Sequence, residues 1–233
     1  KESGAKWRAR IFDPITTLCL FVHQSLGGDP SCRAALAGLL ARASGQGPSL
    51  GSGAYVRARE RLSLAWLKGL LLSQAEGLMA QCPEEWKWKG RQAKLVDGTT
   101  ISMPDTRENQ ERFPAHDPKK TGVAFPTARL VVVVSLSLGV VLGAAMGAYR
   151  GKGSGETSLL KQMLGLFEPG DVVVFDRYYA GYWTLALLVQ HGVDFVTLQH
   201  RLRKTDFRRG RRLGRKDHVV RLKKPKSRPE GMS

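Results

Sequence analysis

The chain has 233 residues, of which 42% are hydrophobic and 24% are charged, and its formal net charge is +17. This length is enough for one or two domains with a buried core, and the composition is typical of a soluble globular protein. Three scattered cysteines, Cys19, Cys32 and Cys82, form no C-x-x-C pair. Their spacing argues against a disulfide framework and against a structural zinc site, and it fits a reducing cytosol.

The positive charge lies in two flanking segments. Residues 1–96 contain 14 Lys/Arg and 7 Asp/Glu, residues 97–200 contain 9 and 10, and residues 201–228 contain 14 and 2. A basic flank attracts polyanions, of which nucleic acid is the commonest large one and anionic lipid is the competitor. The first 14 residues lack a hydrophobic signal region. We expect both ends to be cut from a longer sequence.

The N-terminal third reads as helical. Short helices are predicted over 14–24 and 31–43, the second with Ser31 as its N-cap. A Gly/Pro/Ser loop over 45–53 leads to a longer amphipathic helical region over 54–79 that could be broken. Arginines at the start of this region form either a solvated helix face or a set of phosphate contacts; they are Arg57, Arg59 and Arg61.

The pattern changes after residue 92. A β-branched, alternating strand is predicted over 94–103, followed by a polar, proline-containing stretch over 104–126 that reads as a long surface loop. Further on, helices and strands alternate, which indicates an α/β fold with a mixed sheet and helices against it. These later elements are a helix over 156–167, a strand over 171–175, a helix over 181–191 and a strand over 194–200.

Residues 130–148 form a run of 19 residues without a charge, just long enough for a membrane helix. Glycines at every fourth position would suit a close helix pair. Four consecutive valines, Val131–Val134, and the alternation of serine and leucine after them favour strands instead. Because Gly139 lies where a turn would fall, we predict a hairpin of two strands.

Two carboxylates stand out by position. Asp97 lies inside the strand predicted over 94–103, and Asp176 follows the apolar strand over 171–175. Neighbouring strands would place both at one edge of the sheet, where a shared divalent cation relieves their repulsion. Hard oxygen ligands favour Mg²⁺ or Mn²⁺, and a two-metal site can activate water or a 3′-hydroxyl against a phosphodiester. The alternative is that Asp97 and Gly98 mark a turn and Asp176 caps the following helix.

Other candidate sites are weaker. Residues 151–157 are glycine-rich but do not match the P-loop pattern, the five histidines show no metal spacing, and no G-x-S-x-G motif is present. Glu156 is assigned to structure, since a carboxylate suits a helix start. Arg177 could contact phosphate or pair with Asp176. The basic segment over 201–228 contains interleaved apolar residues, which favour a partly ordered, β-rich element that contacts nucleic acid.

Four stretches, in this order and spacing, resemble the bacterial insertion-sequence transposases with a DDE active site on an RNase H-like core. They are LVDGTTISMPDT, FPTARLVVVVSLSLGVVLGAAMG, GKGSGETSLLKQML and PGDVVVFDRYYAGYW. The group concerned is the family-four insertion sequences, whose third carboxylate lies in a Tyr-x2-Arg-x3-Glu-x6-Lys helix. The resemblance implies that Asp97 and Asp176 are the first two catalytic and metal-binding aspartates. The third carboxylate is missing from this sequence, so the chain by itself is expected to be inactive.

The resemblance also implies an organisation and a set of partners. An N-terminal helical DNA-binding region (1–92) would precede an incomplete RNase H-like catalytic core (93–200) and the start of a basic β-rich insertion (201–233). The expected partners are transposon ends and target DNA, bound by a homodimer in the bacterial cytoplasm near the nucleoid, with two Mg²⁺ or Mn²⁺ ions and no membrane. The predicted DNA contacts are Arg57, Arg61, Arg177, Arg208, Arg209, Arg211, Arg212, Arg215 and Lys216.

Two alternatives to a transposase remain open. A structure-selective nuclease on the same RNase H-like core would cleave DNA strands without joining them. A truncated, non-catalytic DNA-binding protein would occupy transposon ends, with a steep salt dependence and no metal-dependent cleavage.

Overall fold

The computed structural model describes residues 11–42, 52–115, 125–206 and 208–227. The chain forms two compact units, Lys1–Leu70 and Leu71–Ser233. The predicted boundary at residue 92 stays a prediction, as does the assignment of a DNA-binding role to the N-terminal region.

The first unit is helical, as expected. It contains α1 (Pro14–Leu26), α2 (Cys32–Arg42), α3 (Ser52–Glu60) and the beginning of α4 (Leu64–Ala80). The Ser31 hydroxyl accepts a hydrogen bond from the backbone N–H of Ala34 at 3.1 Å, which confirms its role as the N-cap of α2. The helices enclose a small core around the fully buried Tyr55, whose hydroxyl donates to Gln24 at 2.9 Å. Burial raises the pKa of this phenol.

The helical region predicted over 54–79 is broken into two helices. Helix α3 ends at Glu60, and α4 begins at Leu64 after Ser63, whose hydroxyl accepts a hydrogen bond from the N–H of Trp66 at 3.1 Å. Ser63 thus satisfies a backbone donor that would otherwise have no partner at the start of α4.

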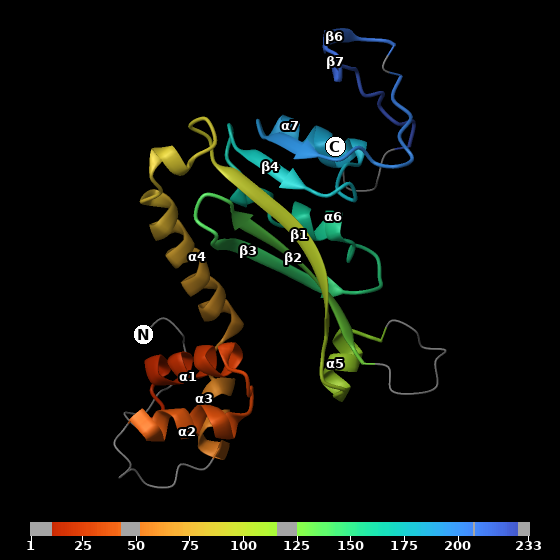
Figure 1. Cartoon of the computed structure of the whole chain (residues 1–233). Coiled ribbons are helices and arrows are strands. Elements are labelled where there is room, and N and C mark those ends of the chain that lie inside the picture. The colour runs from red at the N-terminus through yellow and green to blue at the C-terminus, as the bar shows by residue number, and fades with distance from the viewer. Residues whose placement is uncertain (1–10, 43–51, 116–124, 207, 228–233) are drawn as a thin grey trace. The chain divides into compact units, whose positions relative to one another are not determined.

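The second unit is built on a five-stranded mixed sheet with the strand order β3-β2-β1-β4-β5 (Figure 1). Strands β1, β2 and β3 are antiparallel neighbours, whereas β4 pairs in parallel with both β1 and β5. This arrangement confirms the predicted α/β, RNase H-like fold class. The strands are β1 (Ala93–Ser102), β2 (Thr127–Ser135), β3 (Val141–Ala148), β4 (Val172–Phe175) and β5 (Asp194–Thr197).

The uncharged run is a hairpin, as predicted. Strands β2 and β3 pair in antiparallel fashion, and the turn between them contains Gly139 with a φ of +67°, a conformation that favours glycine. Within the described ranges, no helix is both long enough and apolar enough to cross a membrane.

Short helices cover one face of the sheet. Side chains of α6 (Glu156–Lys161) and α7 (Tyr182–Gln190) pack with Val96, Val133 and Val173 in a single hydrophobic core. The helix predicted over 156–167 is interrupted: α6 ends at Lys161, and a 3₁₀ turn, η2 (Leu164–Leu166), follows. Strand alternation sends the intervening residues to the other face, where Leu95 and Val132 are half-buried and Val196 is 55% exposed.

The loop predicted over 104–126 also needs correction. This stretch is not entirely a loop, because it contains α5 (Arg107–Arg112). The Thr106 hydroxyl accepts a hydrogen bond from the N–H of Asn109 at 3.2 Å and so caps this helix. A six-residue helix of polar residues has no apolar period by which it could be recognised. Residues 116–124 of the predicted loop lie outside the described part of the chain.

The C-terminal basic segment contains the β-rich element that its interleaved apolar residues predict. Strands β6 (Arg211–Gly214) and β7 (Asp217–Val219) form a two-stranded antiparallel hairpin. Gly210, directly before it, has a φ of +115°, and a Cβ at this position would lie 2.2 Å from the Val219 carbonyl oxygen. Only glycine fits there. The remaining short element of the unit is the 3₁₀ turn η1 (Glu84–Trp86).

Candidate active site

The structure places Asp97 on β1 and Asp176 directly after β4, which is the parallel neighbour of β1. The register of the two strands pairs Val96 with Phe175, and each aspartate is the next residue in the chain. Neighbouring strands lie about 4.8 Å apart. Val96 and Phe175 are buried in the core, whereas both aspartates are exposed. The two aspartates therefore follow paired residues of neighbouring strands, the arrangement that the sequence predicts for these strands.

Backbone donors orient both carboxylates. The N–H of Gly98 donates to Asp97 Oδ1, and the N–H of Tyr178 donates to Asp176 Oδ1, both at 2.8 Å. A carboxylate oxygen that accepts a backbone N–H has a restricted side-chain orientation. The second oxygen of each aspartate has no hydrogen bond from the described residues, so it is available to a ligand.

The alternative interpretation of the two aspartates is wrong. Asp97 and Gly98 do not mark a turn, because β1 continues through them to Ser102. Asp176 does not cap the following helix either, since the residue at the N-cap of α7 is Gly181. Asp176 instead begins the turn after β4, in which its side chain accepts from the Tyr178 N–H.

The donor set fits a hydrated Mg²⁺ or Mn²⁺ ion. Mg²⁺ is commonly held by one or two carboxylates, with water and substrate phosphates completing its shell. Asp97 and Asp176 supply such a pair of hard oxygen ligands. Across the ranges that the structure describes, no group of three or more His, Cys, Asp or Glu side chains is placed to hold a metal.

Two residues beside the aspartates were not predicted to belong to the site. Tyr179 is 1% exposed, and burial raises the pKa of its phenol well above the usual range, with the charges of Glu156, Asp97 and Asp176 adding to the effect. The Tyr179 hydroxyl lies near enough to Glu156 for the negative charge of that carboxylate to affect the phenol. It makes no hydrogen bond of ordinary geometry with any described residue. Glu156 is the first residue of α6, as the sequence predicts. Nothing in the local sequence distinguishes Tyr179 from its exposed neighbour Tyr178.

The predicted DNA-contact residues fall into three separate places. Arg177 follows Asp176, is half-buried and makes no ion pair with any described residue. Arg57 and Arg61 are exposed in the first unit, on α3 and directly after it. The others are exposed on the β6–β7 hairpin or directly before it and are Arg208, Arg209, Arg211, Arg212, Arg215 and Lys216.

Some of the hairpin arginines already have partners. Arg208 Nε donates to Asp206 Oδ1 at 3.0 Å, and Arg209 Nε lies 3.6 Å from Asp206 Oδ2. Hydrogen bonds from Arg208 lower the pKa of the Asp206 carboxyl. A hollow of about 450 Å³ beside these residues is lined by further cations, which are Arg203, Lys204, Arg221 and Lys223. The segment thus retains a strong excess of positive charge after its internal pairing.

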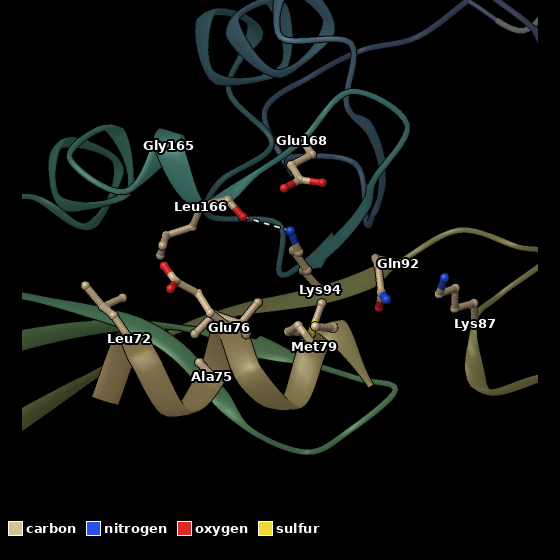
Figure 2. Close-up of a pocket in the computed structure, with 12 residues that line it drawn as sticks. Leu72, Ala75, Glu76, Met79, Lys87, Gln92, Lys94, Gly165, Leu166 and Glu168 are labelled. Carbon is tan, nitrogen blue, oxygen red and sulfur yellow. Dashed lines mark hydrogen bonds between the residues drawn. The ribbon is translucent and has the colours of Figure 1, made fainter. Parts of the chain in front are cut away.

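A second cavity, of about 480 Å³, is separate from the aspartates (Figure 2). Side chains of α4, including Glu76 and Met79, face Lys94 and Leu166 across it. Lys94 Nζ donates to the Leu166 carbonyl oxygen at 2.7 Å and to Asp171 Oδ2 at 2.6 Å. Since neither Asp97 nor Asp176 lines this cavity, it is not part of the carboxylate site.

Comparisons with known proteins identify the family of the chain. Residues 88–229 match the model of the family described as "Transposase DDE domain". The chain is also similar to the transposase InsG for insertion sequence element IS4 of Escherichia coli (strain K12), with 26% identity over 185 residues. This match covers 77% of the chain and 40% of the relative, so the chain spans less than half the length of that protein. With its family model matched over the greater part of its length, the chain belongs to the transposase DDE domain family.

Proposed function

We propose that this chain is part of a DNA transposase of an insertion sequence, which hydrolyses phosphodiester bonds at transposon ends and joins the freed 3′-hydroxyl to target DNA. The observation that supports this function is the adjacency of Asp97 and Asp176 at the end of β4, each with one oxygen held by a backbone N–H. The family indicates the reaction class, and the two neighbouring carboxylates are the metal ligands that this class needs.

In this proposal, Asp97 and Asp176 bind the divalent metal through their open oxygens. The metal, when bound, activates the attacking oxygen and stabilises the leaving oxygen of an in-line displacement. No covalent enzyme intermediate is needed, so the site requires no serine or tyrosine nucleophile. Arg177 is placed directly after Asp176, has no competing ion pair among the described residues and would contact a DNA phosphate. We expect the third carboxylate in the remainder of the full protein, within a Tyr-x2-Arg-x3-Glu-x6-Lys helix.

The proposed partners are transposon terminal repeats and target DNA, bound by a homodimer in the bacterial cytoplasm. The net charge of +17 and the exposed cations of residues 201–227 support a polyanionic partner. The exposed Arg57 and Arg61 of the first unit would add phosphate contacts.

We expect the complete protein to cut DNA that contains the element's terminal repeats and to join the ends to a second duplex. Both reactions should need Mg²⁺ or Mn²⁺ and should stop when EDTA removes the metal. Labelled oligonucleotide assays separate the steps. Cleavage without joining would identify a nuclease on the same core instead, and metal-independent cleavage would refute the two-carboxylate mechanism.

The salt dependence of DNA binding should report the contribution of the hairpin. Replacing Arg211, Arg212 and Arg215 by glutamine is expected to reduce the slope of log K against log salt by about 0.9 for each phosphate that the hairpin no longer neutralises. Fluorescence anisotropy at several salt concentrations measures this slope. Replacing Arg107, Arg112 and Lys161, which lie outside the hairpin, is the control with equal charge loss. Equal slopes for the two triple variants would show that DNA does not bind at the hairpin.

A non-catalytic DNA-binding protein is the second candidate function. It is favoured by the exposed cations of residues 201–227, which would bind DNA without any metal chemistry. Such a chain would bind terminal repeats with a steep salt dependence and would show no metal-dependent cleavage under any of the assay conditions above.

A further inference from the structure

A partly buried polar cluster lies against the strand that holds Asp97. It consists of Glu156 at the start of α6, Tyr179 in the turn after β4, and Arg129 on β2. The Glu156 and Arg129 side chains are only 21% and 16% exposed, and Arg129 Nε lies 3.6 Å from Glu156 Oε1. Arg129 Nη1 also donates to the Ser154 carbonyl oxygen at 3.3 Å, which ties β2 to the turn before α6.

This cluster packs closely against the backbone of β1 at Gly98. A Cβ on Gly98 would lie 2.7 Å from both Cδ and Oε2 of Glu156, and 2.9 Å from the Tyr179 hydroxyl oxygen. These distances are shorter than real Cβ atoms tolerate. Glu156 and Tyr179 therefore occupy the space that a side chain at position 98 would need, so this position requires glycine.

Gly98 is also the residue whose N–H orients Asp97. Its N–H donates to Asp97 Oδ1 at 2.8 Å. The pairing of β1 with β4 ends at Val96 and Phe175, whereas β2 pairs with β1 through Asp97 and Gly98 as far as Ser102. From Asp97 onward, one edge of β1 therefore has no strand partner, and Glu156 and Tyr179 add a contact at Gly98 from one face of the sheet. Strand alternation places Asp97 on the other side from both of them.

We propose that Glu156 and Tyr179 are positioning residues for Asp97: they fix the backbone at Gly98 and thereby the orientation of the metal-binding carboxylate. The buried Tyr179 hydroxyl lies near the Glu156 carboxylate, and burial together with that charge raises the pKa of the phenol. This inference rests on the proposed metal site at Asp97 and Asp176. Residues that orient metal ligands typically change metal affinity by 10- to 100-fold when they are altered.

The test is Mn²⁺ binding to the purified chain, measured by electron paramagnetic resonance without DNA. Glu156→Ala should weaken Mn²⁺ binding about tenfold and should change the line shape of the bound ion. Glu156→Gln keeps the volume and an acceptor oxygen against Gly98, so it should restore most of the affinity. Glu108→Ala removes an exposed carboxylate from the first turn of another short helix and should change neither quantity. Circular dichroism and thermal melting of each variant separate loss of the fold from loss of the site.

Two further variants distinguish the possible failures. Asp97→Asn should abolish Mn²⁺ binding, and full retention by this variant would refute the metal site itself. If Asp97→Asn loses the ion while Glu156→Ala binds it like the unaltered chain, the positioning role is refuted. Should Glu156→Ala fail to fold, Tyr179→Phe decides, because it keeps the ring packing against Phe175 and removes only the hydroxyl. Weaker binding by Tyr179→Phe supports the inference, and unchanged binding overturns it.

Discussion

Asp97→Asn in the complete enzyme is expected to reduce DNA cleavage to less than about one hundredth, because even the partners of metal ligands change activity by 10- to 100-fold. Asparagine has the shape of aspartate, and its carbonyl oxygen can still accept the hydrogen bond from the Gly98 N–H. It cannot neutralise a cation, so the metal site loses a charged ligand while the strand stays intact. Asp176→Asn should have the same effect, since its oxygen can still accept from Tyr178.

DNA binding should survive both substitutions. Removing a negative charge beside a phosphate lowers repulsion, so the affinity for DNA should be unchanged or slightly higher. Cleavage of a labelled transposon end and gel-shift binding measure the two properties on the same preparation. Asp105→Asn is the matched control, because Asp105 is an exposed aspartate before α5 whose carboxylate accepts a hydrogen bond from Gln110. This variant should cleave DNA normally. Normal cleavage by either active-site variant would remove that residue from the mechanism.

The features that the sequence predicts well are those that depend on local pattern. Val131–Val134 and the alternating residues after them identify the β2–β3 hairpin, because strand residues alternate between two faces. An apolar strand followed by a charged residue places Asp176 at the end of β4, and parallel pairing with β1 then brings it to Asp97. Each of these inferences needs only the residues of one or two strands.

The features that were missed depend on contacts between distant residues. Gly98, Glu156 and Tyr179 lie on three different elements, and their contact exists only once α6 packs against the sheet. The sequence assigns Glu156 to a helix start, which is correct, but it does not show which strand its carboxylate meets. Likewise, Lys94 reads as an ordinary polar residue of an alternating strand, although the structure buries it.

Lys94 forms a buried ion pair with Asp171, in which each side chain is only 6% exposed. Asp171 Oδ2 also accepts from the N–H of Glu168, and Lys94 Nζ also donates to the Leu166 carbonyl oxygen. The pair thus joins the amino ends of β1 and β4 to the η2 turn. Its two residues are 77 positions apart, so no local pattern reveals it.

Lys94→Met is expected to destabilise the second unit by about 3–5 kcal/mol, because it leaves the Asp171 carboxylate buried without its counter-charge. Adding Asp171→Asn should recover most of this loss, since the amide is neutral and its oxygen can still accept from Glu168. Hydrogen exchange of β1 and β4 amides measures the free energy of opening for this unit alone.

Lys87→Met provides the comparison, because Lys87 pairs with Glu84, a largely exposed partner three residues earlier. Exposed pairs of this kind contribute little to stability, so this variant should exchange almost as slowly as the unaltered chain. A loss for Lys94→Met that the second substitution does not reduce would show that packing of the lysine stem, rather than charge, dominates at this position. Recovery in the double variant would instead establish that the buried charges stabilise the fold only as a pair, at the amino ends of β1 and β4.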